Sequence, residues 1–149
     1  MIGRCYIFFI MVGSALNTAD HALKKTIISS SQASSTTIAK LTDAIMHVES
    51  RFNDSAIGDN GKAIGCLQIH PVLVREVNRL QEVEYTLEDR WDRKKSIEMF
   101  NIILKNYKLS KAKSFMDSAE IISRRWNGGP KGDNKKCTEK YWEKVKEKL

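Results

Sequence analysis

The sequence predicts an all-α fold, and two observations support this prediction. Apolar residues recur at helical spacing along several segments after residue 35, whereas no segment of convincing length alternates apolar and polar residues as a half-buried strand does. Six of the eight glycines and both prolines lie in or beside two short regions, near residues 58–71 and 128–132. We therefore expect helices joined by two structured loops, with a short β-hairpin between residues 55 and 70 as the one candidate sheet.

The first 22 residues have the layout of a secretory signal peptide. A short positive start at Arg4 precedes an unbroken apolar run over residues 5–12, and small residues follow. The run is too short to serve as a lasting membrane span. A buried N-terminal helix and an uncleaved anchor stay open as alternatives. We expect export to the periplasm, the cell wall or the medium, with no stable membrane insertion after cleavage.

Composition indicates one soluble domain. The 149 residues, 42% apolar and 29% charged, suffice for a single core. Residues 23–35 are rich in serine and lysine and are expected to be a linker, which leaves 36–149 as the folded domain. The formal net charge of +7 favours anionic partners. The C-terminal lysines alternate with glutamates, which is typical of a solvated helix face, so no nucleic-acid partner is expected.

The first helix is predicted to begin at Ser35 or Thr36, both good N-caps. At 100° per residue its apolar stripe lies within about 80° of Ile38, and Glu49 falls about 20° from Ile38 on that same face. A carboxylate on the buried face near a helix C-terminus is disfavoured by desolvation and by the helix dipole. Both effects raise its pKa, as a general acid near neutral pH requires. The alternative is a structural glutamate paired with Arg51.

Four further helices are predicted along the chain. Pro71 opens a helix, Thr86 to Asp89 fits a capping box for a helix reaching about Tyr107, and Thr138 caps a last helix. The inward residues of the four helices are expected to be, in order, Leu73, Val77 and Leu80; Ile97, Phe100, Leu104 and Tyr107; Phe115, Ala119, Ile122 and Trp126; and Tyr141 or Trp142, Val145 and Leu149.

Three short strings carry a resemblance to a known family. They are Glu49-Ser50-Arg51-Phe52-Asn53, then Gly65-Cys66-Leu67-Gln68-Ile69, and later Trp126-Asn127-Gly128-Gly129-Pro130. In this order they resemble the lytic transglycosylase and goose-type lysozyme family, whose pattern is a catalytic Glu-Ser ending a helix, a Gly-Leu-Met-Gln-Ile-like loop and an Ala-Tyr-Asn-Ala-Gly-like turn. The resemblance implies a lysozyme-like fold and covers roughly residues 36–149.

The resemblance also implies an activity and its residues. Glu49 would protonate the glycosidic oxygen between N-acetylmuramic acid and N-acetylglucosamine in peptidoglycan. Ser50 would orient that carboxyl or a sugar acetamide. The loop over residues 65–69 would line one side of the sugar cleft, and Trp126 with Asn127 would form the other. The implied substrate-binding residues are Ser50, Leu67, Gln68, Ile69, Trp126 and Asn127.

Two departures from the family pattern stand out. Cys66 and Leu67 replace the usual Leu-Met, which changes packing more than chemistry. Trp126 replaces the usual tyrosine, so a phenolic hydroxyl is lost at that position, although a tryptophan can stack on a sugar ring. Plain core packing of Trp126 is the alternative.

The resemblance implies a lytic transglycosylase in which one glutamate acts as acid and then as base, with no cofactor and no metal. The alternative is a hydrolytic, goose-type lysozyme that uses two carboxylates. Asp54, Asp59 and Asp133 are candidates for the second carboxylate. Of these, we assign Asp59 to positioning the attacking water. A non-catalytic glycan-binding module is a further alternative. His47 and His70 have no partners in a metal or triad spacing.

Two cysteines follow the signal segment, and an even count in an exported protein permits one disulfide. The resemblance implies that the 65–69 string and the 126–130 string border one cleft. Cys66 lies in the first of these and Cys137 lies a few residues after the second, so we expect the two to pair. Two free thiols are the alternative. The protein is expected to act on peptidoglycan strands as a monomer.

Overall fold

The computed structural model describes residues 36–107, 109 and 112–149. The predicted signal peptide (1–22) and linker (23–35) lie outside the described residues. Residues 38–149 form one compact unit. That unit is mostly helical with one small sheet, so the predicted fold class is confirmed. Within the described part of the chain, no helix combines the length and apolar character needed to cross a membrane.

The first described helix covers residues 36–50 and confirms the sequence prediction. Its apolar stripe enters the core, where Leu41 and Ile45 are fully buried. Thr42 is also buried, and its hydroxyl donates a hydrogen bond to the Ile38 carbonyl over 2.9 Å. The helix ends immediately after Glu49 and Ser50, so it delivers both residues to one edge of the core.

Helices α2 (Pro71–Gln81) and α3 (Arg93–Lys105) pack against each other. Pro71 opens α2 as predicted. The single helix expected from Thr86 to Tyr107 is wrong at its start: a 3-10 turn, η2 (Glu88–Trp91), comes first. Asp92 then adopts an extended conformation and accepts a hydrogen bond from the Lys95 N–H, which begins α3 anew.

Helices α4 (Phe115–Gly128) and α5 (Glu139–Lys146) also pack against each other. Ser114 caps α4 by accepting from the Asp117 N–H. Between them lie two 3-10 turns, η3 (Gly132–Asn134) and η4 (Lys136–Thr138). Thr138 precedes α5 as predicted but does not cap it, because its hydroxyl contacts the carbonyls of Gly132 and Lys135 instead.

The predicted hairpin is present. Strands β1 (Ile57–Gly58) and β2 (Ala63–Ile64) pair antiparallel, joined by the 3-10 turn η1 (Asp59–Gly61). A bridge from Ile64 to Ile69 folds the following loop back on β2. The hairpin thereby holds the 65–69 loop against the core.

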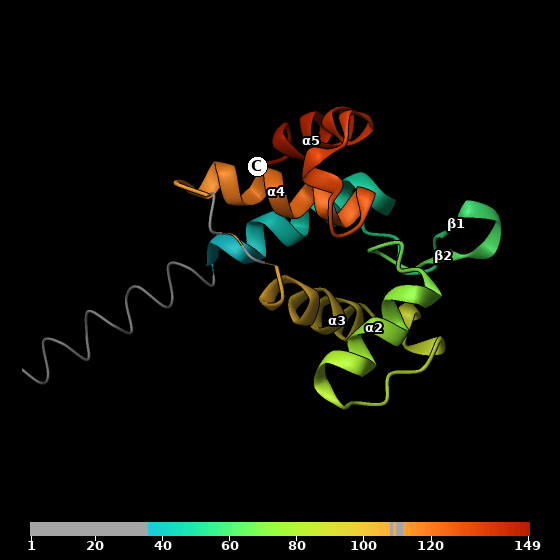
Figure 1. Cartoon of the computed structure of the whole chain (residues 1–149). Helices are drawn as coiled ribbons and strands as arrows, with labels where there is room; N and C mark the ends of the chain where they lie inside the picture. Colours follow the sequence, from blue (N-terminus) through green and yellow to red (C-terminus); the bar gives the residue numbers. More distant parts are fainter. Residues whose placement is uncertain (1–35, 108, 110–111) are drawn as a thin grey trace, which may run out of the picture. The chain divides into compact units, whose positions relative to one another are not determined.

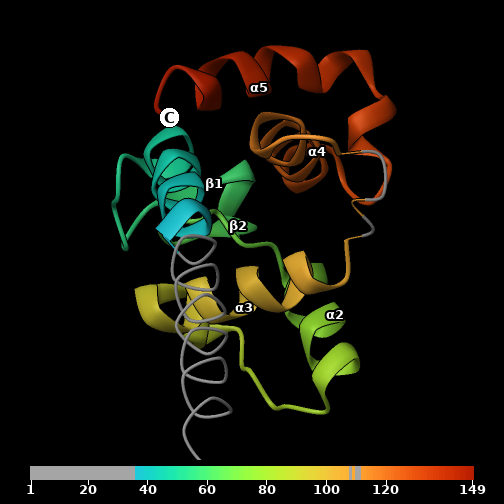
Figure 2. The ribbon, with the colours of Figure 1, turned by 90° about the vertical axis from the view of Figure 1, so that its left-hand side faces the viewer.

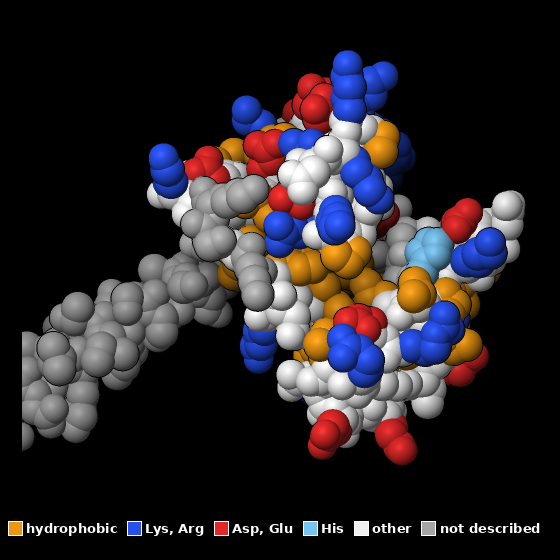
Figure 3. Space-filling model, in the orientation of Figure 1, with side chains coloured by type: hydrophobic (Ala, Val, Ile, Leu, Met, Phe, Trp, Pro, Cys, Tyr) orange, Lys and Arg blue, Asp and Glu red, His pale blue; other side chains and the backbone are white. Residues whose placement is uncertain are grey.

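The core lies where the helix over residues 36–50 meets the other helices. Both ribbon views show α4 and α5 together on one side and α2 and α3 together on the other (Figures 1 and 2). On the face drawn in Figure 3, hydrophobic side chains gather at the middle of the unit, between these two helix pairs, with lysines and arginines on both sides. The fully buried large side chains include Leu41, Ile45, Leu67, Ile69, Met99, Phe100, Ile122 and Val145.

Candidate active site

Glu49 is an enclosed carboxyl with a raised pKa. The hydroxyl of Tyr141 donates a hydrogen bond to Glu49 Oε1 over 2.7 Å. Burial raises the pKa of Glu49 to about 7, against a smaller lowering by the side chains of Tyr141 and Trp126. The residue keeps part of its surface accessible. A carboxyl that is half protonated near neutral pH and still reachable can act as a general acid.

Two helices that come much later in the sequence, α4 and α5, supply the side chains around this carboxyl. Tyr141 lies in α5 and is separated from Glu49 by 92 positions in the chain. Trp126 lies in the last turn of α4, where its ring packs edge-on against the buried ring of Phe100, with centroids 4.8 Å apart and planes at 74°. Trp126 therefore packs against the core and is a neighbour of Glu49, and its contact with a sugar ring stays a prediction. Asn127 follows it and is exposed.

The turn after Glu49 is left-handed and contains no glycine. Arg51 (φ 54°) and Phe52 (φ 63°) both occupy a region that costs a non-glycine residue on the order of 1–3 kcal/mol. Ser50 fixes the start of this turn: its hydroxyl donates to the Cys66 carbonyl over 2.9 Å and accepts from the Asn53 N–H over 3.0 Å. Ser50 thus joins the end of the helix to the 65–69 loop. Its predicted contact with Glu49 or a sugar acetamide stays a prediction.

The 65–69 loop is held by its own hairpin. Gly65 has φ +78°, and a Cβ there would lie 2.0 Å from the Arg90 carbonyl oxygen. The Gln68 side-chain amide donates to the carbonyls of Ala56 and Gly65 at 3.3 and 3.0 Å. Gln68 is partly exposed, so contact with a substrate stays a prediction for this residue.

Leu67 and Ile69 do not line an accessible surface. They are 0% and 1% exposed and belong to the main core. The prediction that they bind substrate is wrong, because the bridge between Ile64 and Ile69 turns this part of the loop inward. Their role is to hold the loop in place.

Comparison with known protein families agrees with this geometry. The family model described as the transglycosylase SLT domain matches residues 26–148. The chain belongs to the transglycosylase SLT family. The search for similar curated proteins and the search for similar solved structures gave no match. Membership supports a lysozyme-like domain with a peptidoglycan-related, glycosidic-bond-cleaving activity.

The carboxylates that were candidates for a second catalytic group in this SLT domain each lie next to an arginine or a histidine. Asp54 binds Arg93 through two hydrogen bonds of 2.9 Å. Asp133 lies 2.8 Å from the guanidinium of Arg125. Asp59 is exposed, and its carboxylate lies 3.7 Å from the ring of His70.

The predicted disulfide of the SLT domain is wrong, since Cys66 and Cys137 are both free thiols. Cys66 is 1% exposed, and its thiol contacts Asp54; burial raises the pKa of this thiol to about 11. Cys137 is exposed and lies in η4, beside the buried Thr138. The 65–69 loop and Trp126 both lie near the end of the helix that carries Glu49. Cys66, however, is buried in the core, whereas Cys137 is exposed to solvent.

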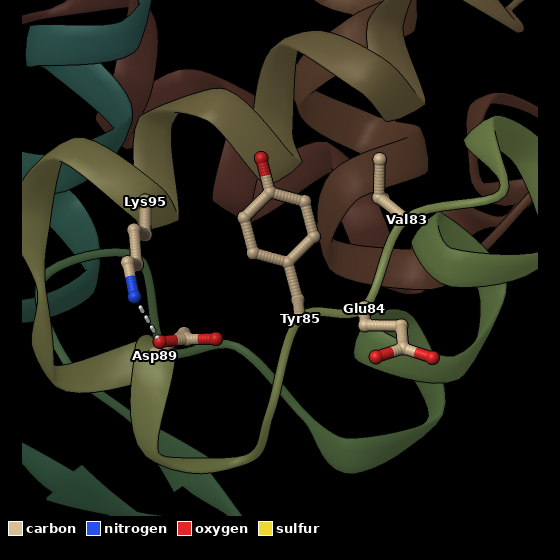
Figure 4. A pocket seen from close by; sticks show the side chains of 5 residues that line it. All are labelled: Val83, Glu84, Tyr85, Asp89 and Lys95. Carbon is tan, nitrogen blue, oxygen red and sulfur yellow. Dashed lines mark hydrogen bonds and ion pairs between the residues drawn. The ribbon is translucent and has the colours of Figure 1, made fainter.

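A hollow on the SLT domain whose lining does not include Glu49 does not offer the same chemistry. It is lined by Val83, Glu84, Tyr85, Asp89 and Lys95 (Figure 4). Lys95 forms an ion pair with Asp89, and this hydrogen bond is the main reason why the pKa of Asp89 is lowered. A carboxyl held ionised is a poor acid catalyst. Among the described residues, no three His, Cys, Asp or Glu side chains are grouped as a metal site would require.

Sequence reasoning missed Tyr141 as a functional residue. It placed Tyr141 or Trp142 on the inward face of the last helix, which is correct as packing, since both are partly buried against the core. The signal was a tyrosine on an apolar helix face, whose hydroxyl needs a hydrogen-bond partner when buried. Glu49, the other buried-face polar residue, is that partner.

Proposed function

We propose that this protein is a peptidoglycan lytic transglycosylase that cleaves the β-1,4 bond between N-acetylmuramic acid and N-acetylglucosamine with Glu49 as its single acid and base. The observation that carries this proposal is the carboxyl of Glu49, which belongs to a partly exposed residue, accepts a hydrogen bond from Tyr141 and has a pKa of about 7. A nucleophile or water-activating base requires a second carboxyl aimed at the sugar, and Asp54 and Asp133 are both bound to arginines.

The proposed reaction proceeds in two steps. Protonated Glu49 gives its proton to the glycosidic oxygen, and the bond between this oxygen and C1 of the muramic acid breaks. The carbonyl oxygen of the sugar's own acetamide stabilises the positive charge at C1. The 6-hydroxyl of the same sugar then attacks C1, and its proton returns to the Glu49 carboxylate. No water is consumed, and the product ends in a 1,6-anhydro ring.

The residues around Glu49 support this cycle. Tyr141 donates to one carboxyl oxygen and so fixes the orientation of the acid. Trp126 offers a ring held rigidly by Phe100, suited to lie along a sugar, and exposed Asn127 offers an amide beside it. Extracytoplasmic action, release from a signal peptide and a monomeric state are part of the same proposal.

Product analysis tests the reaction type. Isolated peptidoglycan treated with the full-length protein should show a clearing band on zymography and release muropeptides that end in 1,6-anhydro rings on mass spectrometry. Products 18 Da heavier, which carry an added water, would instead make the protein a hydrolytic lysozyme. Binding to peptidoglycan without any cleavage would identify a glycan-binding module.

Changing Tyr141 to phenylalanine should move the alkaline limb of the pH–rate profile to higher pH. The active form of Glu49 is protonated, so activity should fall as pH rises through about 7. Because the Tyr141 hydroxyl lowers the pKa of Glu49, its loss lets that pKa rise further and extends activity toward alkaline pH. The measurement is initial cleavage rate between pH 4 and 10.

Tyr85→Phe is the matched control for this prediction. The Tyr85 hydroxyl also bonds a glutamate, Glu98, over 3.1 Å, but outside the proposed site. This variant should leave the alkaline limb where it is in the wild type. A Tyr141→Phe profile that coincides with the wild type would contradict the assignment of the limb to Glu49.

A further inference from the structure

The two left-handed residues after Ser50 need contacts that hold them in place. Neither Arg51 nor Phe52 has the freedom of glycine in this region, so the turn persists only where its surroundings enforce it. The helix supplies part of the support: the Arg51 N–H donates to the His47 carbonyl over 3.0 Å, and the Phe52 N–H donates to the Met46 carbonyl over 3.4 Å. The second of these bonds is long.

Arg93 supplies support from a different helix. It is the first residue of α3, and its Nη2 donates to the Phe52 carbonyl oxygen over 2.6 Å. The same guanidinium bonds both carboxylate oxygens of Asp54 at 2.9 Å. One planar group therefore holds two points of the turn, which the single ammonium of a lysine cannot reproduce.

We propose that Arg93 is a positioning residue of the active site, which keeps the left-handed turn closed and thereby holds Glu49 against Tyr141. The inference rests on the proposed function in treating Glu49 as the acid. Glu49 lies two residues before Arg51, and the turn is its covalent continuation. If the turn opens, the last turn of the helix frays and the carboxyl loses its alignment with Tyr141 and the sugar.

Helix α3 is well placed for this task because it supports the site at two points. Arg93 at its start holds the turn after Glu49, and Phe100, seven residues later, packs against Trp126. Phe100 is fully buried, so this helix is anchored in the core. A rigid helix that contacts both sides fixes the distance between them.

The exposure of the Arg93 pair allows a positioning effect to be separated from unfolding. The side chains of Arg93 and Asp54 are 44% and 40% exposed, and ion pairs this exposed contribute little to overall stability. Removing Arg93 should therefore leave the folded unit intact while it releases the turn.

The test compares Arg93→Met with Arg79→Met in the full-length protein, acting on soluble glycan strands prepared from peptidoglycan. Arg79 is the matched control, because it also forms a two-point ion pair, with Glu76, on the exposed surface of α2. Arg93→Met should lower kcat by about 10- to 100-fold, the size expected for misplacing a catalytic group by about 1 Å, with KM little changed. Arg79→Met should change neither constant.

The pH profile gives a second readout that a purely structural role would not move. Burial raises the pKa of Glu49, so a carboxyl that swings into solvent has a lower pKa. The alkaline limb of Arg93→Met should therefore move to lower pH. Arg93→Lys should lie between Arg93→Met and the wild type in rate.

A rescue variant tests the backbone mechanism directly. Arg51 is exposed, and glycine at its place adopts the left-handed conformation without strain. Adding Arg51→Gly to Arg93→Met should restore most of the lost kcat. The inference is overturned if Arg93→Met keeps wild-type kcat and pH profile, or if Arg51→Gly restores none of the lost rate. Cleavage by Glu49→Gln would instead overturn the acid assignment, whatever Arg93 does.

Discussion

Replacing Glu49 with glutamine should lower the rate of glycan cleavage by about 100- to 10,000-fold, the range that general acid catalysis supplies. Glutamine keeps the size of the side chain and still accepts a hydrogen bond from Tyr141, but it has no proton to give to the glycosidic oxygen. The variant should fold normally and still bind glycan strands. Cleavage rates on isolated peptidoglycan, together with pull-down of the variant by insoluble peptidoglycan, measure the two properties separately.

Glu98→Gln is the closest control for this substitution. Glu98 also accepts a hydrogen bond from a tyrosine, Tyr85, and the same chemical change there should leave cleavage within a factor of about two. Asp59→Asn removes the carboxylate beside His70 and should also cost far less than Glu49→Gln. If Asp59→Asn were the more damaging change, a two-carboxylate hydrolase would replace the single-glutamate mechanism.

The stability of Glu49→Gln gives an independent check on the raised pKa. A folded-state pKa of about 7, against 4.5 for an ordinary glutamate, means that folding favours the protonated form. The wild type should therefore lose stability as pH rises from 4.5 to 7, by about 3 kcal/mol before solvent screening reduces the figure. Glutamine does not titrate, so the variant should become more stable than the wild type above pH 7. Urea unfolding at pH 5 and pH 8 measures this difference.

The elements with regular apolar spacing were predictable from the sequence. The helix over residues 36–50 and α4 have such spacing, and both are present where the sequence placed them. The same helical geometry put Glu49 on the buried face near the C-terminus of its helix, which is why its raised pKa was predictable too. Local periodicity fixes which face of a helix a residue occupies.

Features that depend on contacts between distant segments were not predictable in this way. Tyr141 reaches Glu49 across 92 positions, and no local pattern records that distance. The Cys66–Cys137 disulfide failed for the same reason: two cysteines near one site need not have their side chains directed toward each other. The capping box at Thr86 begins a 3-10 turn rather than a long helix. The chain becomes extended at Asp92, which caps a separate helix, α3.

Replacing Gly65 with alanine should destabilise the domain by about 2–5 kcal/mol, through a strained backbone and a steric clash together. Gly65 has φ +78°, where alanine is strained, and the added Cβ would lie 2.0 Å from the Arg90 carbonyl oxygen. That carbonyl cannot move freely, because it accepts a hydrogen bond from buried Ser96, 3.0 Å away. The loop carrying Cys66 and Gln68 would have to shift away from η2, and with it the anchor of Ser50.

Gly61→Ala separates the two contributions to this loss. Gly61 has φ +85°, but a Cβ there meets no atom within 4 Å. Alanine at this position therefore incurs the backbone strain alone, about 1–2 kcal/mol. Thermal or urea unfolding of both variants should show a loss for Gly65→Ala that exceeds the loss for Gly61→Ala by about 1–3 kcal/mol, the usual cost of overpacking. Equal losses would mean that the hairpin moves away from η2 without resistance, and the 65–69 loop would then not be a rigid anchor for Ser50.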